Sequence, residues 1–139
     1  MHSAPRRPVT IADLPTPALL VEQSRLRDNL DAMQTTADAN DATLRPHVKT
    51  HKSVALARRQ RERGAEGLTV ATVKEAETFV NAGFDDVRVA YPVTGRHKHE
   101  RLQALRDDAT ISFTVDTVAG AEQASAVYAE ANTPVDVLM

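Results

Sequence analysis

Short apolar runs alternate with segments of helical periodicity along most of the 139-residue chain. The apolar run at residues 17–21 predicts a first strand. Leu26, Leu30 and Met33 then recur at helical spacing and predict a helix over residues 24–40. The same alternation continues to the last residue. The further strands that it predicts span residues 43–49, 67–72, 86–91, 110–115 and 135–139, and the further helices span residues 53–63, 73–81, 99–106 and 117–132.

This order of elements predicts the fold class. Regular alternation of strand and helix, with roughly 20 to 25 residues per unit, is typical of an α/β protein with a parallel sheet, either doubly wound or closed into a (β/α) barrel. No G-x-G-x-x-G or G-x-x-x-x-G-K-[ST] motif follows a predicted strand, which disfavours a nucleotide-binding doubly wound sheet. A TIM-type (β/α) barrel is the preferred interpretation, because barrels keep their sites at the carboxyl ends of their strands.

The length of the chain limits how much of a barrel it can form. A complete eight-stranded barrel needs about 250 residues, whereas this chain supplies about five barrel strands and stops within an apolar run. We therefore expect a flexible start at residues 1–12, followed at 13–139 by the N-terminal portion of a truncated barrel. An apolar strand at an open sheet edge is prone to aggregate or to pair with another chain.

Composition narrows the function classes. The chain is 42% hydrophobic and 26% charged, as in ordinary globular domains. A net charge of −2 and five aromatic residues do not suit a nucleic-acid partner, and no apolar run is long enough to cross a membrane. The absence of cysteine excludes disulfides, thiolate nucleophiles and sulfur-ligated metals. We expect a cytoplasmic protein without nucleic-acid or membrane partners.

The most distinctive segment is Arg-Pro-His-Val-Lys-Thr-His-Lys at residues 45–52, which has five cationic or imidazole side chains in eight positions. If it ends a strand, the two-residue period places Arg45, His47 and Lys49 on one face. In contrast, Val87 and Val89 of a later strand are expected to form an ordinary core layer inside the barrel.

Lys49 is the candidate nucleophile of this segment. An amine at the end of an apolar barrel and close to other cations should have its pKa lowered by desolvation and by like-charge repulsion. A neutral lysine forms Schiff bases with aldehydes, and neighbouring cations favour a phosphate, so pyridoxal phosphate is the natural carbonyl partner. The alternative is a solvated loop whose charges simply face water.

Five further residues have both a functional and a structural interpretation. His47 would orient the cofactor ring or relay protons, or serve as a hydrogen-bonded structural histidine. Arg45 would contact the cofactor or pair with a carboxylate. His51 would shape a positive site or lie in an exposed turn, and Thr72 is favoured as a helix cap over a cofactor contact. Tyr91, at a strand end, is a candidate for stacking on the cofactor or hydrogen bonding to it.

Three other basic residues favour a structural interpretation. Lys52 is expected to be an exposed turn residue. His97 and His99 lie at the start of a polar helix, and we expect both to face solvent rather than to bind a metal.

The basic segment, together with residues 14–21 before it and 67–77 after it, resembles the D-threonine aldolase and D-serine dehydratase group of alanine racemase-like enzymes. These are fold-type III pyridoxal phosphate proteins. The resemblance implies that Lys49 forms the Schiff base, and the match at residues 85–92 implies that Tyr91 lies near the cofactor. It also implies a separate β domain, loops that hold the cofactor phosphate, and a divalent metal. The phosphate loops and metal ligands lie downstream of the matched region, so no metal ligand is assigned in this chain.

The function implied by the resemblance is a pyridoxal phosphate-dependent lyase that acts on β-hydroxy D-amino acids, with Lys49 and His47 as catalytic candidates. A D-threonine aldolase-like enzyme breaks the Cα–Cβ bond, whereas the alternative, a D-serine dehydratase-type elimination, removes the Cα proton and expels the hydroxyl. A third alternative is an inactive barrel fragment or a non-catalytic module that binds the cofactor. Family members often pair, so a homodimer or a complementing chain is the expected partner besides the small-molecule substrate.

Overall fold

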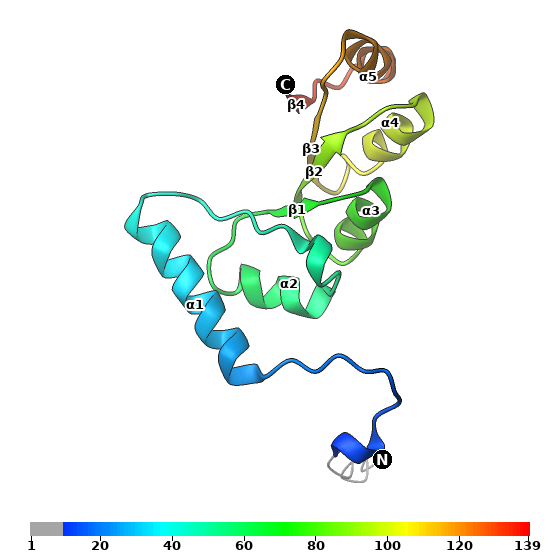
Figure 1. Ribbon diagram of the computed structural model, residues 1–139. Coiled ribbons are helices and arrows are strands. Elements are labelled where there is room, and N and C mark those ends of the chain that lie inside the picture. Colours follow the sequence, from blue (N-terminus) through cyan, green and yellow to red (C-terminus); the bar gives the residue numbers. More distant parts are fainter. Residues whose placement is uncertain (1–9) are drawn as a thin grey trace, which may run out of the picture.

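A computed structural model describes residues 10–139 (Figure 1). The predicted flexible start at residues 1–12 falls mainly on residues that lie outside the described part, and its last residues enter a 3₁₀ turn, η1 (Ile11–Asp13). The helical elements that follow are α1 (Gln23–Ala39), the 3₁₀ turn η2 (Val48–Thr50), α2 (Val54–Arg61), α3 (Val73–Asn81), α4 (Arg96–Gln103) and α5 (Val118–Glu130).

Four strands form one parallel sheet in the order of the sequence, β1-β2-β3-β4. Their bounds are β1 (Leu68–Val70), β2 (Asp86–Pro92), β3 (Thr110–Thr114) and β4 (Asp136–Leu138). One helix connects each strand to the next, and Figure 1 shows α3, α4 and α5 lined up along the same side of the strands. The α/β class with a parallel sheet is thus confirmed. A strand order without a reversal is that of a barrel segment and not of a doubly wound sheet.

The core lies between the sheet and its helices. Val87, Val89 and Phe113 are fully buried, and the Phe113 ring lies 5.1 Å from the ring of His99 in α4 and 5.7 Å from that of Tyr128 in α5. The prediction that Val87 and Val89 form a core layer is confirmed, but this layer lies between the sheet and its helices and not inside the barrel. The two-residue period shows which residues share a face, but both faces of a barrel sheet are covered, so the period alone does not say which face meets the helices.

The opposite face of the sheet carries a polar row. Thr69, Arg88 and Ser112 are aligned in register on β1, β2 and β3, and all three are half-buried. His47 extends the row through a single parallel bridge to Thr69. This face corresponds to the interior of a barrel, and within residues 10–139 it is not covered by helices.

Two predicted strands are absent from the described chain. Residues 17–21 form no strand, and Leu19 is 94% exposed, because no neighbouring strand offers it hydrogen bonds or an apolar face. Of the strand predicted at residues 43–49, only the bridge at His47 and two flanking backbone hydrogen bonds are present, from Glu66 N–H to the carbonyl of Leu44 and from Thr69 N–H to that of Pro46. Lys49 therefore lies in η2 and not on a strand.

A bidentate ion pair fixes the segment before η2 to the start of β2. The two terminal nitrogens of the Arg45 guanidinium, Nη1 and Nη2, each donate to one carboxylate oxygen of Asp86 at 2.6 Å. A Cβ atom on Gly67 would collide with the Arg45 guanidinium, so the glycine leaves room for this pair to cross β1. The hydrogen bonds to Asp86 also raise the pKa of Arg45.

Candidate active site

Lys49 lies where the polypeptide leaves the sheet, at the edge formed by the carboxyl ends of the parallel strands, here called the carboxyl edge. The fully buried side chain of Val48 anchors η2 in the core, so Lys49 and Thr50 are turned outward. His47 precedes this turn, and its Nδ1 accepts a hydrogen bond of 3.4 Å from the backbone N–H of Lys49. This geometry fixes the backbone at Lys49 from two sides.

The ammonium group of Lys49 has no hydrogen bond or ion pair within residues 10–139. The side chain is exposed, so the prediction that an apolar barrel end would desolvate it is wrong for this part of the chain. The reason is local, because η2 replaces the predicted strand end and turns Lys49 away from the core. Lys49 is accordingly a free and accessible amine at the carboxyl edge.

Glu75, on the first turn of α3, is the one buried carboxylate among the described residues, at 8% exposure. One carboxylate oxygen accepts a hydrogen bond of 2.7 Å from the backbone N–H of Ala71, and the other lies 3.1 Å from Nζ of Lys52. Burial alone would raise the pKa of Glu75, but the Ala71 N–H and the Lys52 ammonium outweigh it and hold that pKa below its ordinary value. The nearby His47 acts in the same direction.

Sequence reasoning did not single out Glu75 as a site residue. A Thr-x-x-Glu pattern predicts the start of a helix. The structure agrees, because Oγ1 of Thr72 accepts a hydrogen bond of 3.1 Å from the Glu75 N–H and caps α3. The capping interpretation of Thr72 is thus confirmed. The signal that could have identified Glu75 as a site residue was the predicted parallel topology. In a parallel sheet, the residues that follow one strand lie at the same edge as the residues that follow the next.

His51 is directed toward α2. Its Nδ1 accepts a 3.0 Å hydrogen bond from the backbone N–H of Ser53, which caps that helix. Its Nε2 is buried without a hydrogen-bond partner. Burial lowers the pKa of His51, and the nearby Gln60 side chain opposes this only in part. His51 is therefore half-buried against the start of α2, which differs from the exposed turn that was the structural alternative. The ion pair with Asp86 supports the structural interpretation of Arg45, at the far end of the strands.

Tyr91 lies near the end of β2, and its described contacts are with α4. The Lys98 ammonium lies 5.7 Å from the centre of the Tyr91 ring, and the half-buried ring packs against the core. No contact in residues 10–139 brings Tyr91 to Lys49. Of the six catalytic and cofactor-binding residues predicted from the sequence, the structure brings His47 and Lys49 together, whereas Arg45, His51, Thr72 and Tyr91 make their described contacts elsewhere.

His99 is completely buried, so the prediction that it faces solvent is wrong, whereas His97 is exposed as expected. The ring of His99 packs against Phe113 and lies 6.4 Å from that of Tyr128. The prediction failed because polar neighbours hid a helix face that meets β3. Burial lowers the pKa of His99, with Lys98 adding to the effect and the Val93 backbone opposing it in part.

We expect His99 to make the fold sensitive to acid. A histidine whose pKa is lowered by folding is protonated more readily in the unfolded chain. The stability that it contributes is complete above its unfolded pKa of about 6.5 and is lost as the pH falls from there through the folded pKa. His51 acts in the same direction. Replacing His99 with phenylalanine should reduce the loss of thermal stability between about pH 7.5 and pH 5.5, as measured by circular dichroism melting.

His97→Gln is the matched control for this measurement, because His97 is exposed and lies two residues away on the same helix. It should retain the acid sensitivity of the unmodified chain. An unchanged pH dependence in His99→Phe would contradict the assignment of the effect to the buried ring.

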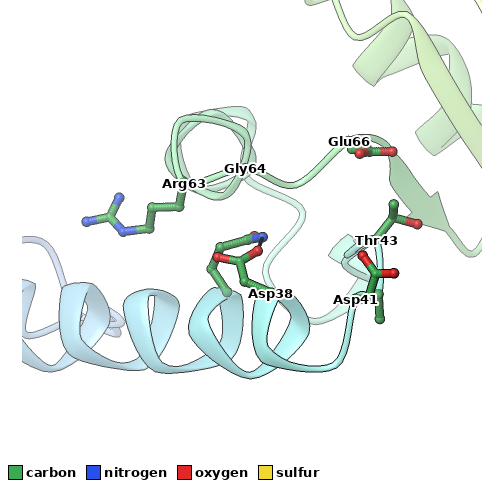
Figure 2. Close-up of a pocket in the computed structure, with 8 residues that line it drawn as sticks. Asp38, Asp41, Thr43, Arg63, Gly64 and Glu66 are labelled. Carbon is green, nitrogen blue, oxygen red and sulfur yellow. Dashed lines mark hydrogen bonds between the residues drawn. The ribbon is translucent and has the colours of Figure 1, made fainter.

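A cavity of about 460 Å³ lies between α1 and the loop before β1 (Figure 2). Figure 2 shows Arg63 directed away from Asp41 and Glu66, and its Nε donates to Asp31 at 2.6 Å. All of the lining residues come before β1 in the chain, and none lies at the carboxyl end of a strand. They are Gln34, Asp38, Asp41, Ala42, Thr43, Arg63, Gly64 and Glu66. This polar cleft has no lysine in its lining and shares no residue with the candidate site.

Neither a metal centre nor a membrane span is present in the described part of the chain. No three histidine, aspartate or glutamate residues within 10–139 converge as metal ligands would. In the same range, none of the helices combines the length and the apolar character that crossing a bilayer requires.

The model of the family described as "Alanine racemase, N-terminal domain" matches residues 21–139. The chain is 41% identical over 117 residues to D-threo-3-hydroxyaspartate dehydratase of Delftia sp. (strain HT23), covering 84% of this chain and 31% of the relative. It is 38% identical over 129 residues to D-threonine aldolase of Arthrobacter sp., covering 93% and 34%. The crystal structure of D-threonine aldolase from Filomicrobium marinum superposes with a TM-score of 0.87 at 37% identity, covering 92% and 35%. The chain thus spans about a third of the length of the relatives it matches.

Proposed function

Because this chain belongs to the alanine racemase N-terminal domain family of fold-type III pyridoxal phosphate enzymes, we propose that it supplies the cofactor-bearing part of a pyridoxal phosphate-dependent lyase. The cofactor would be attached to Nζ of Lys49, and the substrates would be β-hydroxy D-amino acids. When bound, pyridoxal phosphate supplies an electron sink for bond cleavage next to the amino group of a substrate.

The observation that carries the proposal is the unpaired, accessible amine of Lys49 at the carboxyl edge of a parallel sheet. An aldehyde cofactor requires a lysine whose nitrogen is not engaged elsewhere, and Lys49 meets that requirement. The described residues therefore fit the covalent attachment. His47 is the second proposed site residue, because its ring hydrogen bonds to the Lys49 backbone and helps to fix where the amine is offered.

The reaction type is the finer part of the proposal. We place a D-threonine aldolase-like cleavage first and a D-serine dehydratase-type elimination second. Relatives carry names of both kinds, an aldolase and a dehydratase. In the dehydratase branch Lys49 is the proposed base that removes the Cα proton. The divalent metal implied by the family has no ligand cluster in residues 10–139, so no step is derived through it.

The test is direct. Pyridoxal phosphate added to the chain should give an absorbance band of the protein-bound cofactor, and borohydride should convert that band to a stable adduct. A D-amino acid such as D-threonine is then supplied with a divalent metal. Glycine with an aldehyde indicates the aldolase branch, and a 2-oxo acid with ammonia indicates the dehydratase branch. Absence of any trapped cofactor would overturn the proposal.

A second candidate function is a non-catalytic module that binds the cofactor. The exposure of Lys49 favours it, because catalytic lysines act in sites that exclude water and residues 10–139 do not enclose this amine. Trapped cofactor without turnover of any D-amino acid would support this candidate. A cytoplasmic location and pairing as a homodimer or with a complementing chain stay predictions from the sequence.

A further inference from the structure

The basic segment contains two lysines near the carboxyl edge, and their partners differ. Nζ of Lys49 has no partner among residues 10–139, whereas Nζ of Lys52 lies 3.1 Å from a carboxylate oxygen of Glu75. Both lysine side chains are exposed, that of Lys52 to 65%, so access to solvent does not distinguish the two amines. The distinguishing feature is the ion pair.

The carboxylate of Glu75 is held rigidly in the position where it pairs with Lys52. Its side chain is only 10% exposed, one oxygen accepts the Ala71 N–H, and its own backbone N–H is bonded to Thr72 at the start of α3. A carboxylate fixed by a strand end and a helix start does not follow a moving ammonium. The position of the Glu75 carboxylate therefore determines the position of the Lys52 ammonium. Forming the ion pair costs side-chain entropy mainly at Lys52, because Glu75 is already ordered.

The backbone of Lys52 is tied to the turn that carries Lys49. Lys52 has a φ of 48°, in the left-handed region, and its N–H donates to the Val48 carbonyl at 2.8 Å. The ion pair with Glu75 therefore links the end of this turn to the neighbouring β1–α3 connection. Loss of the carboxylate would release the Lys52 side chain and loosen one end of the turn.

We propose that Glu75 is a positioning residue that makes Lys49, and not Lys52, the amine that receives pyridoxal phosphate. The proposal rests on the proposed function of Lys49. Attachment requires a nitrogen lone pair, which forms a bond to the aldehyde carbon while the carbonyl oxygen leaves as water. To react, Lys52 must first break its ion pair with Glu75, whereas Lys49 has no ion pair to break within residues 10–139. Glu75 thus disfavours reaction at Lys52 and leaves Lys49 as the preferred amine.

The experiment measures where the cofactor is attached. The full chain is incubated with pyridoxal phosphate and reduced with borohydride, and the adducts on Lys49 and Lys52 are quantified by peptide mass spectrometry. In Glu75→Gln the share of adduct on Lys52 should rise about threefold, the effect expected for loss of an ion pair whose lysine is exposed to solvent. Glu77→Gln, on the same helix but paired with Arg101, is the matched control and should leave the ratio unchanged.

The outcomes separate this proposal from the one on which it rests. Label on Lys49 in the unmodified chain, with the same Lys49-to-Lys52 ratio in Glu75→Gln, overturns the role of Glu75 alone. Label distributed without preference over the lysines of the unmodified chain overturns the proposed function itself. A larger Lys52 share in Glu75→Gln and not in Glu77→Gln supports both.

A second measurement on the unmodified chain covers the case in which Glu75→Gln fails to fold by circular dichroism. Salt screens exposed ion pairs, so the Lys52 share should rise between low salt and about 1 M salt. The measured quantity is the ratio of adduct on Lys52 to adduct on Lys49. Salt also weakens the attraction of the cofactor phosphate to both lysines, and the ratio cancels that common effect. A ratio that stays constant across this range overturns the proposal.

Discussion

Replacing Lys49 with arginine should abolish attachment of pyridoxal phosphate to the carboxyl edge. Arginine keeps the positive charge that attracts the phosphate, but a guanidinium stays protonated and does not condense with an aldehyde. Both the absorbance band of the bound cofactor and the borohydride-stable adduct should disappear. Because Lys49 is exposed and its side chain makes no hydrogen bond or ion pair in residues 10–139, the free energy of unfolding should change little.

Lys52→Arg is the matched control. It lies on the same turn, and arginine can preserve the ion pair with Glu75. This variant should retain the adduct on Lys49 at close to the level of the unmodified chain. Equal loss of attachment in the two variants would show that general positive charge, and not one specific amine, holds the cofactor.

Replacing Phe113 with alanine should lower the free energy of unfolding by about 3–5 kcal/mol. Phe113 is fully buried on β3, and its ring stacks against Tyr128 at an interplanar angle of 30° and packs against His99. Its removal would leave a cavity between the sheet and two helices, α4 and α5. Urea unfolding followed by circular dichroism measures the change.

Ser112→Ala is the comparison that tests which face of the sheet forms the core. Ser112 is adjacent in sequence but lies on the opposite face, in the half-buried polar row. Its replacement should cost less than about 1 kcal/mol, as is usual away from the core. Similar costs at the two positions would contradict the one-sided core.

Where local patterns were strong, the sequence was sufficient to predict the fold. The helix predicted at residues 73–81 has those bounds in α3, because Thr72 caps its start and an apolar stripe that includes Phe79 faces the core. The alternation of strand and helix also predicted the parallel order of β1 to β4. These features depend on residues close in sequence, where propensity and burial agree.

Most of the errors concern contacts between segments distant in sequence. Residues 17–21 have the composition of a strand but find no partner strand in the described chain. The burial of His99 depends on Phe113, and the role of Glu75 depends on Lys52. Lys49 itself was identified from its segment, but its exposure was not, because η2 replaces the predicted strand end. Periodicity contains no information about which distant segments meet.

The central claim is that one specific nitrogen, Nζ of Lys49, bears the cofactor. The most direct measurement is a crystal structure of the chain after incubation with pyridoxal phosphate and reduction with borohydride. We predict continuous electron density from Lys49 Nζ to the cofactor ring at the carboxyl edge, beside His47. Density that joins the cofactor to another amine, or a reduced chain with no cofactor at Lys49, would contradict it.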